Sequence, residues 1–292
     1  MPAGASAPPQ RDDSARVVLE LSGERTPIRR LYRDFWQHRD LLVMLARQEY
    51  RSRYRSASLG LMWSVALPLI QGVVIAVVFA HLVGTGNAKT FIPYVMSGIV
   101  TWSYLQQSTT VASTSIVDGG AIAGKVYFPR LIMPGVAPSA NLPGYLISLV
   151  VAEVVVLATG SGIHPSILLV VLLVPLAWLL VYAFASVASL GHVYSRDIRY
   201  IVQALTMVLF YATPIIYALG HRPGARALPA NLRPFVIANP VTGVVQLARL
   251  ALSGRGDYVG TSLISTGAWI VGLLVVATFA YARFERVAMD RL

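Results

Sequence analysis

The residues with the clearest potential for chemistry run from Gly119 to Lys125, which follow the G-x-x-x-x-G-K order of a phosphate-binding loop. A working loop of this kind also needs a Ser or Thr after the lysine to hold magnesium, a strand before it and a helix after it. Val126 stands at the magnesium position, an apolar segment precedes the loop and Pro129 soon follows. We therefore interpret the stretch as a false motif, and the chain contains no Gly-Lys-Ser or Gly-Lys-Thr sequence.

Other catalytic arrangements are missing from the sequence. The chain has no cysteine, which excludes disulfides and thiolate metal sites. Its histidines are scattered without the spacing of metal ligands. Glu153 is the one carboxylate well inside an apolar segment, where an acid is functional, bonded across a helix interface or near a membrane boundary. A membrane enzyme of prenyl or glycosyl transfer would need clustered acids, so we expect no catalytic residue, metal or cofactor bound by this chain.

The composition is that of an integral membrane protein. Hydrophobic residues make up 55% of the 292 residues and charged residues 13%, whereas soluble domains are about 25% charged. The net charge of +11 fits basic cytoplasmic loops better than a nucleic-acid partner, and we expect no nucleic acid.

Six segments are long and apolar enough to cross a bilayer, which takes about 20 residues. They are 59–83, 91–115, 134–158, 165–190, 201–219 and 261–282. The second ends in QQSTTVASTS, a polarity that suits a face turned to protein or to an aqueous path. We therefore expect an all-α fold of six transmembrane helices, with residues 59–292 as a single six-span domain.

The distribution of Lys and Arg predicts that both termini are cytoplasmic. The segments 1–58, 116–133, 191–200 and 283–292 hold 18 of the 24 basic residues. Cytoplasmic loops carry this excess in bacterial inner-membrane proteins. Residues 1–27 are polar, lack the apolar core of a signal peptide, and are expected to form a disordered cytoplasmic tail.

Residues 28–58 are expected to form an amphipathic helix in the cytoplasmic interface. Apolar residues recur at helical spacing from Ile28 to Phe35, but the stretch is too charged to cross the membrane. Trp36 would lie at headgroup depth. Arg47, Arg51 and Arg55 are four apart, so they share one face and can anchor the helix on anionic lipid. Such a helix is either only an anchor or also a docking surface.

Two short cytoplasmic loops contain further candidates. The first presents Ile122, Tyr127 and Phe128 close to Lys125 and Arg130. Apolar residues on a short exposed loop indicate a protein contact, and packing against the protein's own interface helix is the alternative. The second holds Arg196, Asp197 and Arg199, which could instead form only a local ion pair.

The outer segment 220–258 begins as a proline-rich loop and continues as a helix too short to span. Asn239 can cap this helix and Pro240 fits its first position. We expect the helix to re-enter the membrane or to lie at its outer interface. Among the aromatic residues of the spans, Tyr94, Trp102 and Tyr211 are candidates for lining a sugar path, although most membrane aromatics are interface anchors.

Together these pieces resemble the membrane subunit of polysaccharide-exporting ABC transporters, the type-2 permeases for O-antigen, capsule, teichoic acid and galactan. The matching pieces are, in order, RYRSASLGLMW with LPLI, KVYFPRLIMP, YSRDIRYIVQ, TPIIY (213–217), ANPVTGVVQLAR (238–249) and RFER (283–286). Each piece alone is weak, but the ordered set covers most of residues 28–292.

The resemblance implies a homodimer in the cytoplasmic (inner) membrane with two copies of a separate P-loop ATPase, which would bind ATP and magnesium. The loop from Gly119 to Arg130 would be the coupling helix that docks on this ATPase, and the interface helix and the Arg196–Arg199 loop would complete the contact. Lipid-linked glycan would pass between the two permease copies, near aromatics of the first, second and fifth spans.

Three other readings stay open at this point. The chain could be a type-2 permease for drugs or lipids, a polytopic membrane enzyme of glycan assembly, or a non-catalytic scaffold. The neighbouring genes would discriminate between the two kinds of permease.

Overall fold

The computed structural model describes residues 28–55, 60, 62–82, 88–119, 130–160, 162–220 and 228–284. These residues form helices and their connections, and no β-strand occurs among them. The expectation of an all-α fold is therefore confirmed for this part of the chain. The termini and most of the loop between Gly119 and Arg130 lie outside it.

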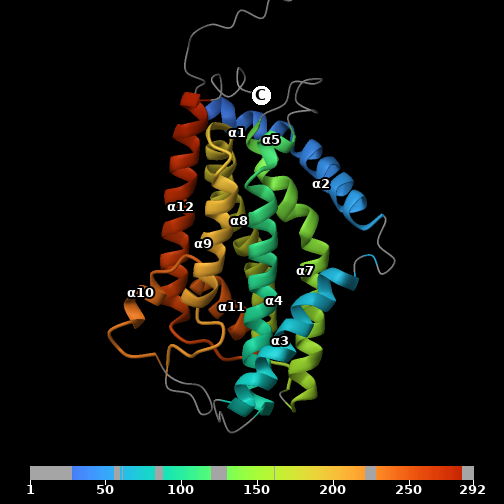
Figure 1. Ribbon diagram of the computed structural model, residues 1–292, viewed down its shortest axis with the longest axis vertical. Helices are drawn as coiled ribbons and strands as arrows, with labels where there is room; N and C mark the ends of the chain where they lie inside the picture. Colours follow the sequence, from blue (N-terminus) through green and yellow to red (C-terminus); the bar gives the residue numbers. More distant parts are fainter. Residues whose placement is uncertain are drawn as a thin grey trace, which may run out of the picture.

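Most of the long helices lie side by side and run roughly along the long axis of the molecule (Figure 1). They are α1 (Ile28–Gln37), α2 (Arg39–Tyr54), α3 (Met62–Leu82), α4 (Ala88–Ala112), α5 (Ser115–Asp118), the 3-10 turn η2 (Arg130–Ile132), α7 (Met133–Ala158), the 3-10 turn η3 (Pro165–Leu169), α8 (Val170–Tyr194), α9 (Ile198–Ala212), α10 (Arg233–Ile237), α11 (Thr242–Ser253) and α12 (Val259–Phe284).

Three of the described helices are long and apolar enough to cross a membrane. They cover Arg130–Ala158, Pro165–Tyr194 and Val259–Arg283. Met62–Val78 and Ile198–Ala212 are apolar but shorter. Helix α4 has 25 residues, and its polar QQSTT stretch sets it apart from the apolar group. The structure thus supports a multi-pass membrane protein, with three clear spans among the described residues.

Helix α4 lies at the centre of the bundle. It packs against α3, α7, α8, α9 and α11, and almost every residue from Phe91 to Leu105 is buried. Its side chains Val95, Ile99 and Val100 belong to the main apolar core. Helix α3 crosses α4 and α7 at the lower end in Figure 1, while α1 and α2 lie at the upper end.

The expected interface helix divides in two at His38. The ring nitrogen Nδ1 of His38 lies 2.8 Å from the carbonyl oxygen of Asp34, and α2 starts at the next residue. Helix α2 then runs at an angle to α1 and packs on α7 through the buried side chains Leu45 and Ala46. The two pieces lie at the same end of the molecule as the carboxyl end of α12 (Figure 1).

The segment expected to span from 201 to 219 is helical only as far as Ala212. Pro214 explains the end of the helix, since the residue before a proline is pushed out of the helical region. Thr213 accordingly has extended dihedrals of φ −91° and ψ 138°. The following residues to Gly220 are not helical, yet most of them are buried.

Helix α11 is enclosed by protein and contacts α4, α8 and α12. All its residues from Thr242 to Leu252 are buried except Leu250. The helix begins at Thr242 rather than directly after Asn239, the expected cap. Asn239 Oδ1 instead accepts a hydrogen bond of 2.9 Å from the Val241 amide and forms a turn ahead of the helix. It ends at Gly254, whose φ of 65° is in the left-handed region that glycine favours.

Candidate functional site

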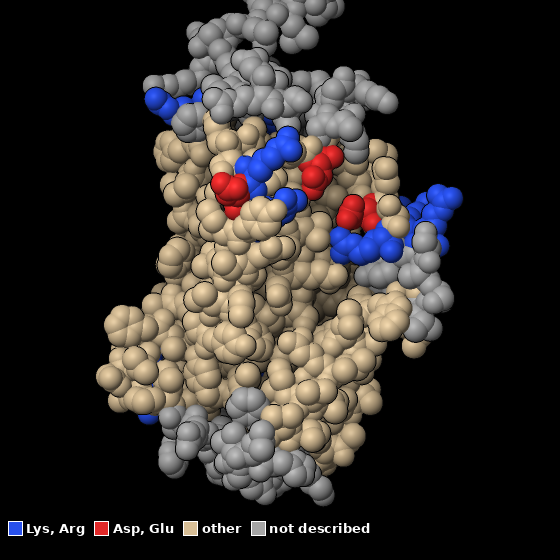
Figure 2. All heavy atoms as spheres, in the orientation of Figure 1, with Lys and Arg blue, Asp and Glu red and all other residues tan. Residues whose placement is uncertain are grey.

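Of the residues expected to contact a cytoplasmic partner, those that the structure describes lie at the upper end of the molecule (Figure 1). Figure 2 shows Lys, Arg, Asp and Glu side chains concentrated there, above a face that is otherwise almost free of charge. Arg196, Asp197 and Arg199 are all exposed in the turn between α8 and α9. The guanidinium of Arg199 lies 4.8 Å from the ring centroid of its neighbour Tyr200, and no ion pair joins Arg196 to Asp197 in this described turn.

The expected coupling loop is described only at its two ends. Ile122, Lys125, Tyr127 and Phe128 lie outside the described residues. Gly119 is buried, and a Cβ atom there would overlap the end of the Met133 side chain. The loop therefore begins beside the start of α7. Arg130, at its other end, is half-buried in the 3-10 turn η2.

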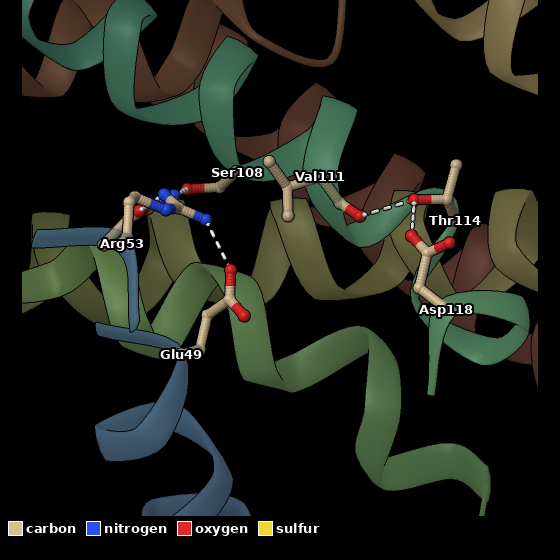
Figure 3. Close-up of polar contacts among 7 residues, drawn as sticks. Glu49, Arg53, Ser108, Val111, Thr114 and Asp118 are labelled. Atoms are coloured by element: carbon tan, nitrogen blue, oxygen red, sulfur yellow. Dashed lines mark hydrogen bonds and ion pairs between the residues drawn. The ribbon is translucent and has the colours of Figure 1, made fainter. Parts of the chain in front are cut away.

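A short helix fixes the start of this loop. Thr114 Oγ1 donates to Asp118 Oδ2 at 2.6 Å and lies 3.2 Å from the carbonyl oxygen of Val111 (Figure 3). These bonds close the single turn of α5 directly after α4. A displacement of the loop would consequently act on the end of α4.

A second polar cluster joins α2 to the bundle (Figure 3). The Arg53 guanidinium donates to Glu49 Oε1 at 2.8 Å and to Asn141 Oδ1. Asn141 Nδ2 in turn donates to Ser108 Oγ at 2.9 Å. The chain of bonds links α2, α7 and α4. Arg53 is the member of the basic run that faces inward, which the spacing of the run alone did not predict.

The other arginines of the run face outward as expected from their spacing of four. Arg47, Arg51 and Arg55 are exposed and line an open groove along one side of α2, together with Val43 and Met44. Trp36 on α1 is also exposed, with the Arg39 guanidinium 5.7 Å from its ring centroid. This mixed basic and apolar surface fits the headgroup region of a membrane.

The polar side chains of α4 open on two sides of that helix. Gln106 lines an apolar cavity of about 40 Å³ between α4, α8 and α9. Gln107 lines a polar pocket between α3, α4 and α7 that also contains Ser64 and Asn141. Both glutamines are exposed. They give the central helix a polar exposed surface.

The three aromatic residues expected near a sugar path lie in different surroundings. Trp102 is buried, donates from Nε1 to Gln106 Oε1 at 2.9 Å and contacts Phe210 edge-on. Tyr211 is 66% exposed on α9. Tyr94 is buried and its hydroxyl donates to the carbonyl oxygen of Tyr217. Trp102 and Tyr211 both adjoin Phe210, whereas Tyr94 lies among other partners at the lower end.

The partner of Tyr94 is a residue that the sequence placed in an outer segment. Arg249 on α11 is fully buried, and its guanidinium lies 3.6 Å from the centroid of the Tyr94 ring. Its Nη2 donates to the carbonyl oxygen of Ile215 at 2.8 Å. The signal in the sequence was a lone arginine in an otherwise apolar helical stretch, where a charge needs fixed partners.

The described residues contain no group of three or more acidic or histidine side chains that could hold a metal ion. Glu153 lies on α7 with both carboxylate oxygens buried, and no hydrogen-bond partner occurs for them within the described part of the chain. The expected bond from Glu153 across a helix interface is therefore not formed within these residues.

Comparisons with known proteins give a consistent picture. The family described as "ABC-2 type transporter" matches residues 40–246. The O-antigen export system permease protein RfbA of Myxococcus xanthus is 30% identical over 211 residues, which are 71% of this chain and 80% of that protein. Two proteins of the same name from Klebsiella pneumoniae are 26% and 22% identical, over 85% and 84% of this chain and 95% and 93% of their own lengths.

Proposed function

Because the chain belongs to the ABC-2 type transporter family, we propose that it is the permease subunit of an ATP-driven exporter of lipid-linked polysaccharide. The observation that carries the proposal is the similarity to O-antigen export permeases along nearly their whole length. A transporter subunit rather than an enzyme also fits the scattered acids and histidines of the sequence. The chemical class of the cargo is thus a long, hydroxyl-rich polymer on a lipid carrier.

ATP binding and hydrolysis belong to a separate ATPase in this proposal. The chain has no complete P-loop of its own, so ATP and magnesium would be held by two copies of the partner. The charged upper end would offer the docking surface, because it holds the exposed Arg196–Arg199 turn and α5, which leads into the expected coupling loop (Figure 1).

The movement of the ATPase would reach the path through the contacts of α2 and α5. Helix α2 is tied to α7 and α4 by Arg53 and Asn141, and α5 is tied to the end of α4 by Thr114. Both routes lead to α4. This helix also carries the exposed Gln106 and Gln107, whose amides can exchange hydrogen bonds with sugar hydroxyls.

The proposed topology has six spans with both termini in the cytoplasm. Helices α3, α4 and α9 would complete the three clear spans, and α11 would be a re-entrant helix enclosed by protein. Two copies of the chain would face each other across α3, α4 and α9, with Trp102 and Tyr211 near the glycan and Tyr94 deeper in the wall.

The proposal is tested by purifying the tagged chain from its native host in a mild detergent. We expect a stoichiometric P-loop ATPase, vanadate-sensitive ATP hydrolysis, and lipid-linked sugar in the same preparation. A chain that copurifies with no ATPase in more than one detergent would contradict the proposal and would favour a membrane enzyme or scaffold. An ATPase without any sugar, but with a drug or lipid as cargo, would contradict the substrate class alone.

The docking surface has its own test, the double change of Tyr127 and Phe128 to alanine. Export should fall by at least tenfold while membrane insertion persists, because the loop would lose the apolar contact that fastens it to the ATPase. Gly272→Ala on α12, where a Cβ atom would meet no atom within 4 Å, is the control away from the docking surface. Normal export by the double variant would exclude this loop as the coupling contact.

A further inference from the structure

Helix α9 and the segment after it differ sharply in how they pack. Among the residues of α9 only Val202 and Thr206 are buried, and the apolar cavity of about 40 Å³ lies beneath it. The non-helical residues that follow are buried far more completely, as Thr213, Pro214, Ile215, Ala218 and Leu219 show. Within one chain, a helix with few buried residues is therefore joined to a largely buried segment at Thr213.

The firmly packed segment is fixed by hydrogen bonds from three other side chains. Arg249 Nη2 donates to the carbonyl oxygen of Ile215 at 2.8 Å. The Tyr94 hydroxyl donates to the carbonyl oxygen of Tyr217. Asn239 Nδ2 donates to Thr213 Oγ1 at 3.0 Å. Backbone carbonyls freed from a helix at membrane depth need such donors from protein, because lipid offers none.

Arg249 also ties the segment to α4. Its Nε lies 3.4 Å from the carbonyl oxygen of Tyr94, and its guanidinium covers the Tyr94 ring. Gly98 provides the space for this contact. A Cβ atom at position 98 would lie 3.3 Å from Arg249 Nη2 and 3.3 Å from Ile215 Cγ2, which is tighter than most Cβ contacts, so these neighbours would have to shift slightly.

We propose that Arg249 is a positioning residue that makes the segment 213–219 a fixed fulcrum on α4, about which α9 tilts during transport. A buried arginine is costly to separate from its partners, so the contact stays closed while α9, which buries only Val202 and Thr206 in its own chain, moves. The inference rests on the proposed function, because it assigns the movement to export.

The position of the fulcrum decides which end of α9 moves. The upper end of the helix begins next to the exposed Arg196–Arg199 turn, whereas its lower end is joined to the fixed segment. A push by the ATPase on that turn would therefore open or close the space between α4 and α9 mainly at the cytoplasmic end. Gln106 and Trp102 line that space.

The first experiment compares the two sides of the fulcrum by cysteine labelling, which the cysteine-free chain makes clean. Gln203→Cys reports on α9 and Ile216→Cys reports on the fixed segment. In the complex with its ATPase, vanadate trapping of nucleotide should change the maleimide labelling rate at position 203 several-fold and leave position 216 unchanged. Equal changes at both positions would overturn the proposal.

The second experiment removes the contacts of the Arg249 guanidinium in the Ile216→Cys chain. Arg249→Met should raise labelling at position 216 several-fold and lower export at least tenfold, while ATP hydrolysis by the complex continues. Arg249→Lys should fall between, because an ammonium can donate to the Ile215 carbonyl but cannot lie flat on Tyr94. Gly98→Ala should act in the same direction more weakly.

The control is Gly272→Ala on α12, where a Cβ atom would meet no atom within 4 Å. Labelling and export should match the parent. All rates are measured on the monodisperse fraction. A purely structural role of Arg249 would reduce the amount of that fraction without changing the labelling rate of position 216, and this result would overturn the fulcrum.

The two proposals fail in different ways. The labelling rate at position 216 can be compared between the parent and Arg249→Met without an ATPase. This comparison therefore tests whether Arg249 fixes the segment 213–219 even if no partner exists. Unchanged labelling at position 216 would refute the positioning role of Arg249 but would not contradict the proposed export function. The absence of an ATPase partner would refute the proposed export function, and with it the role of Arg249 in transport.

Discussion

At the level of single side chains, Arg53, Asn141 and Ser108 connect the interface helix to the centre of the bundle. The Arg53–Asn141 bond joins α2 to α7, and the Asn141–Ser108 bond joins α7 to α4. Asn141 is buried and uses its oxygen toward α2 and its nitrogen toward α4, so it cannot be replaced by an apolar residue without leaving two polar groups without their partner. The expected consequence is energetic coupling between Arg53 and Asn141.

A double-mutant cycle measures this coupling. Asn141→Ala and Arg53→Ala should each lower the free energy of unfolding by roughly 1–3 kcal/mol, since each leaves a buried partner unsatisfied. The double variant should cost less than the two together. Thermal unfolding of the purified protein checks this, with Gln48→Ala on the exposed side of α2 as the control. Fully additive losses would mean that the two residues do not act through one bond.

Gln107 distinguishes a sugar path from a lipid-facing surface. If its exposed amide met only lipid, Gln107→Leu would be neutral or stabilising, because leucine is the better residue in hydrocarbon. If it meets glycan, the same change should leave expression intact and lower export several-fold. Cell-surface polysaccharide per folded chain is the measurement. Val171→Leu, on an exposed position of α8, should leave export unchanged.

The sequence allowed part of this site to be predicted. The shared exposed face of Arg47, Arg51 and Arg55 follows directly from a spacing of four on a helix. The inward position of Arg53 does not, because its partner Asn141 is 88 residues away. Arg249 likewise could be counted only as an outer charge, since its burial depends on Tyr94 and Ile215 in distant segments.

At the level of elements, the long apolar helices were the most predictable feature. Helices α7, α8 and α12 lie close to the expected spans because a run of apolar residues fixes both their type and their length. The end of α9 was missed, although Pro214 marks it in the sequence. Hydropathy continues through TPIIY, so an apolar stretch hid the loss of the helix.

The contact of α11 with α12 depends on a glycine and yields a further prediction. A Cβ atom at Gly243 would lie 2.5 Å from the backbone oxygen of Ser262 and 2.5 Å from Thr266 Oγ1. Gly243→Ala should therefore push the two helices apart and lower the free energy of unfolding by about 1–3 kcal/mol. Gly267→Ala, with open space around its Cβ, should unfold like the parent. Equal melting temperatures for both variants would contradict this packing.

At the level of the whole molecule, most charges on the face in Figure 2 are gathered at one end, and this asymmetry leads to a prediction of the orientation in the membrane. The charged end holds α1, α2 and the turn before α9, and by the distribution of Lys and Arg we expect it to face the cytoplasm. The opposite end holds the loops around α10.

Single cysteines test this orientation. Ser52→Cys on α2 should react with a membrane-impermeant maleimide only in inside-out vesicles. Asn231→Cys, exposed near α10, should react on the opposite side. The cysteine-free parent gives the background. Labelling of both positions from one side would refute the proposed topology.

The buried hydrogen bonds of the segment 213–219 have one more consequence, for the electrical resistance of the membrane. An irregular backbone within a bilayer usually recruits water, and a file of water conducts protons. Here the carbonyls of Ile215 and Tyr217 are satisfied by Arg249 and Tyr94, so the break in the helix needs no hydration at those two points. We therefore expect the resting protein to show no proton conductance in a bilayer. A cell could then keep many copies of it without dissipating the proton-motive force.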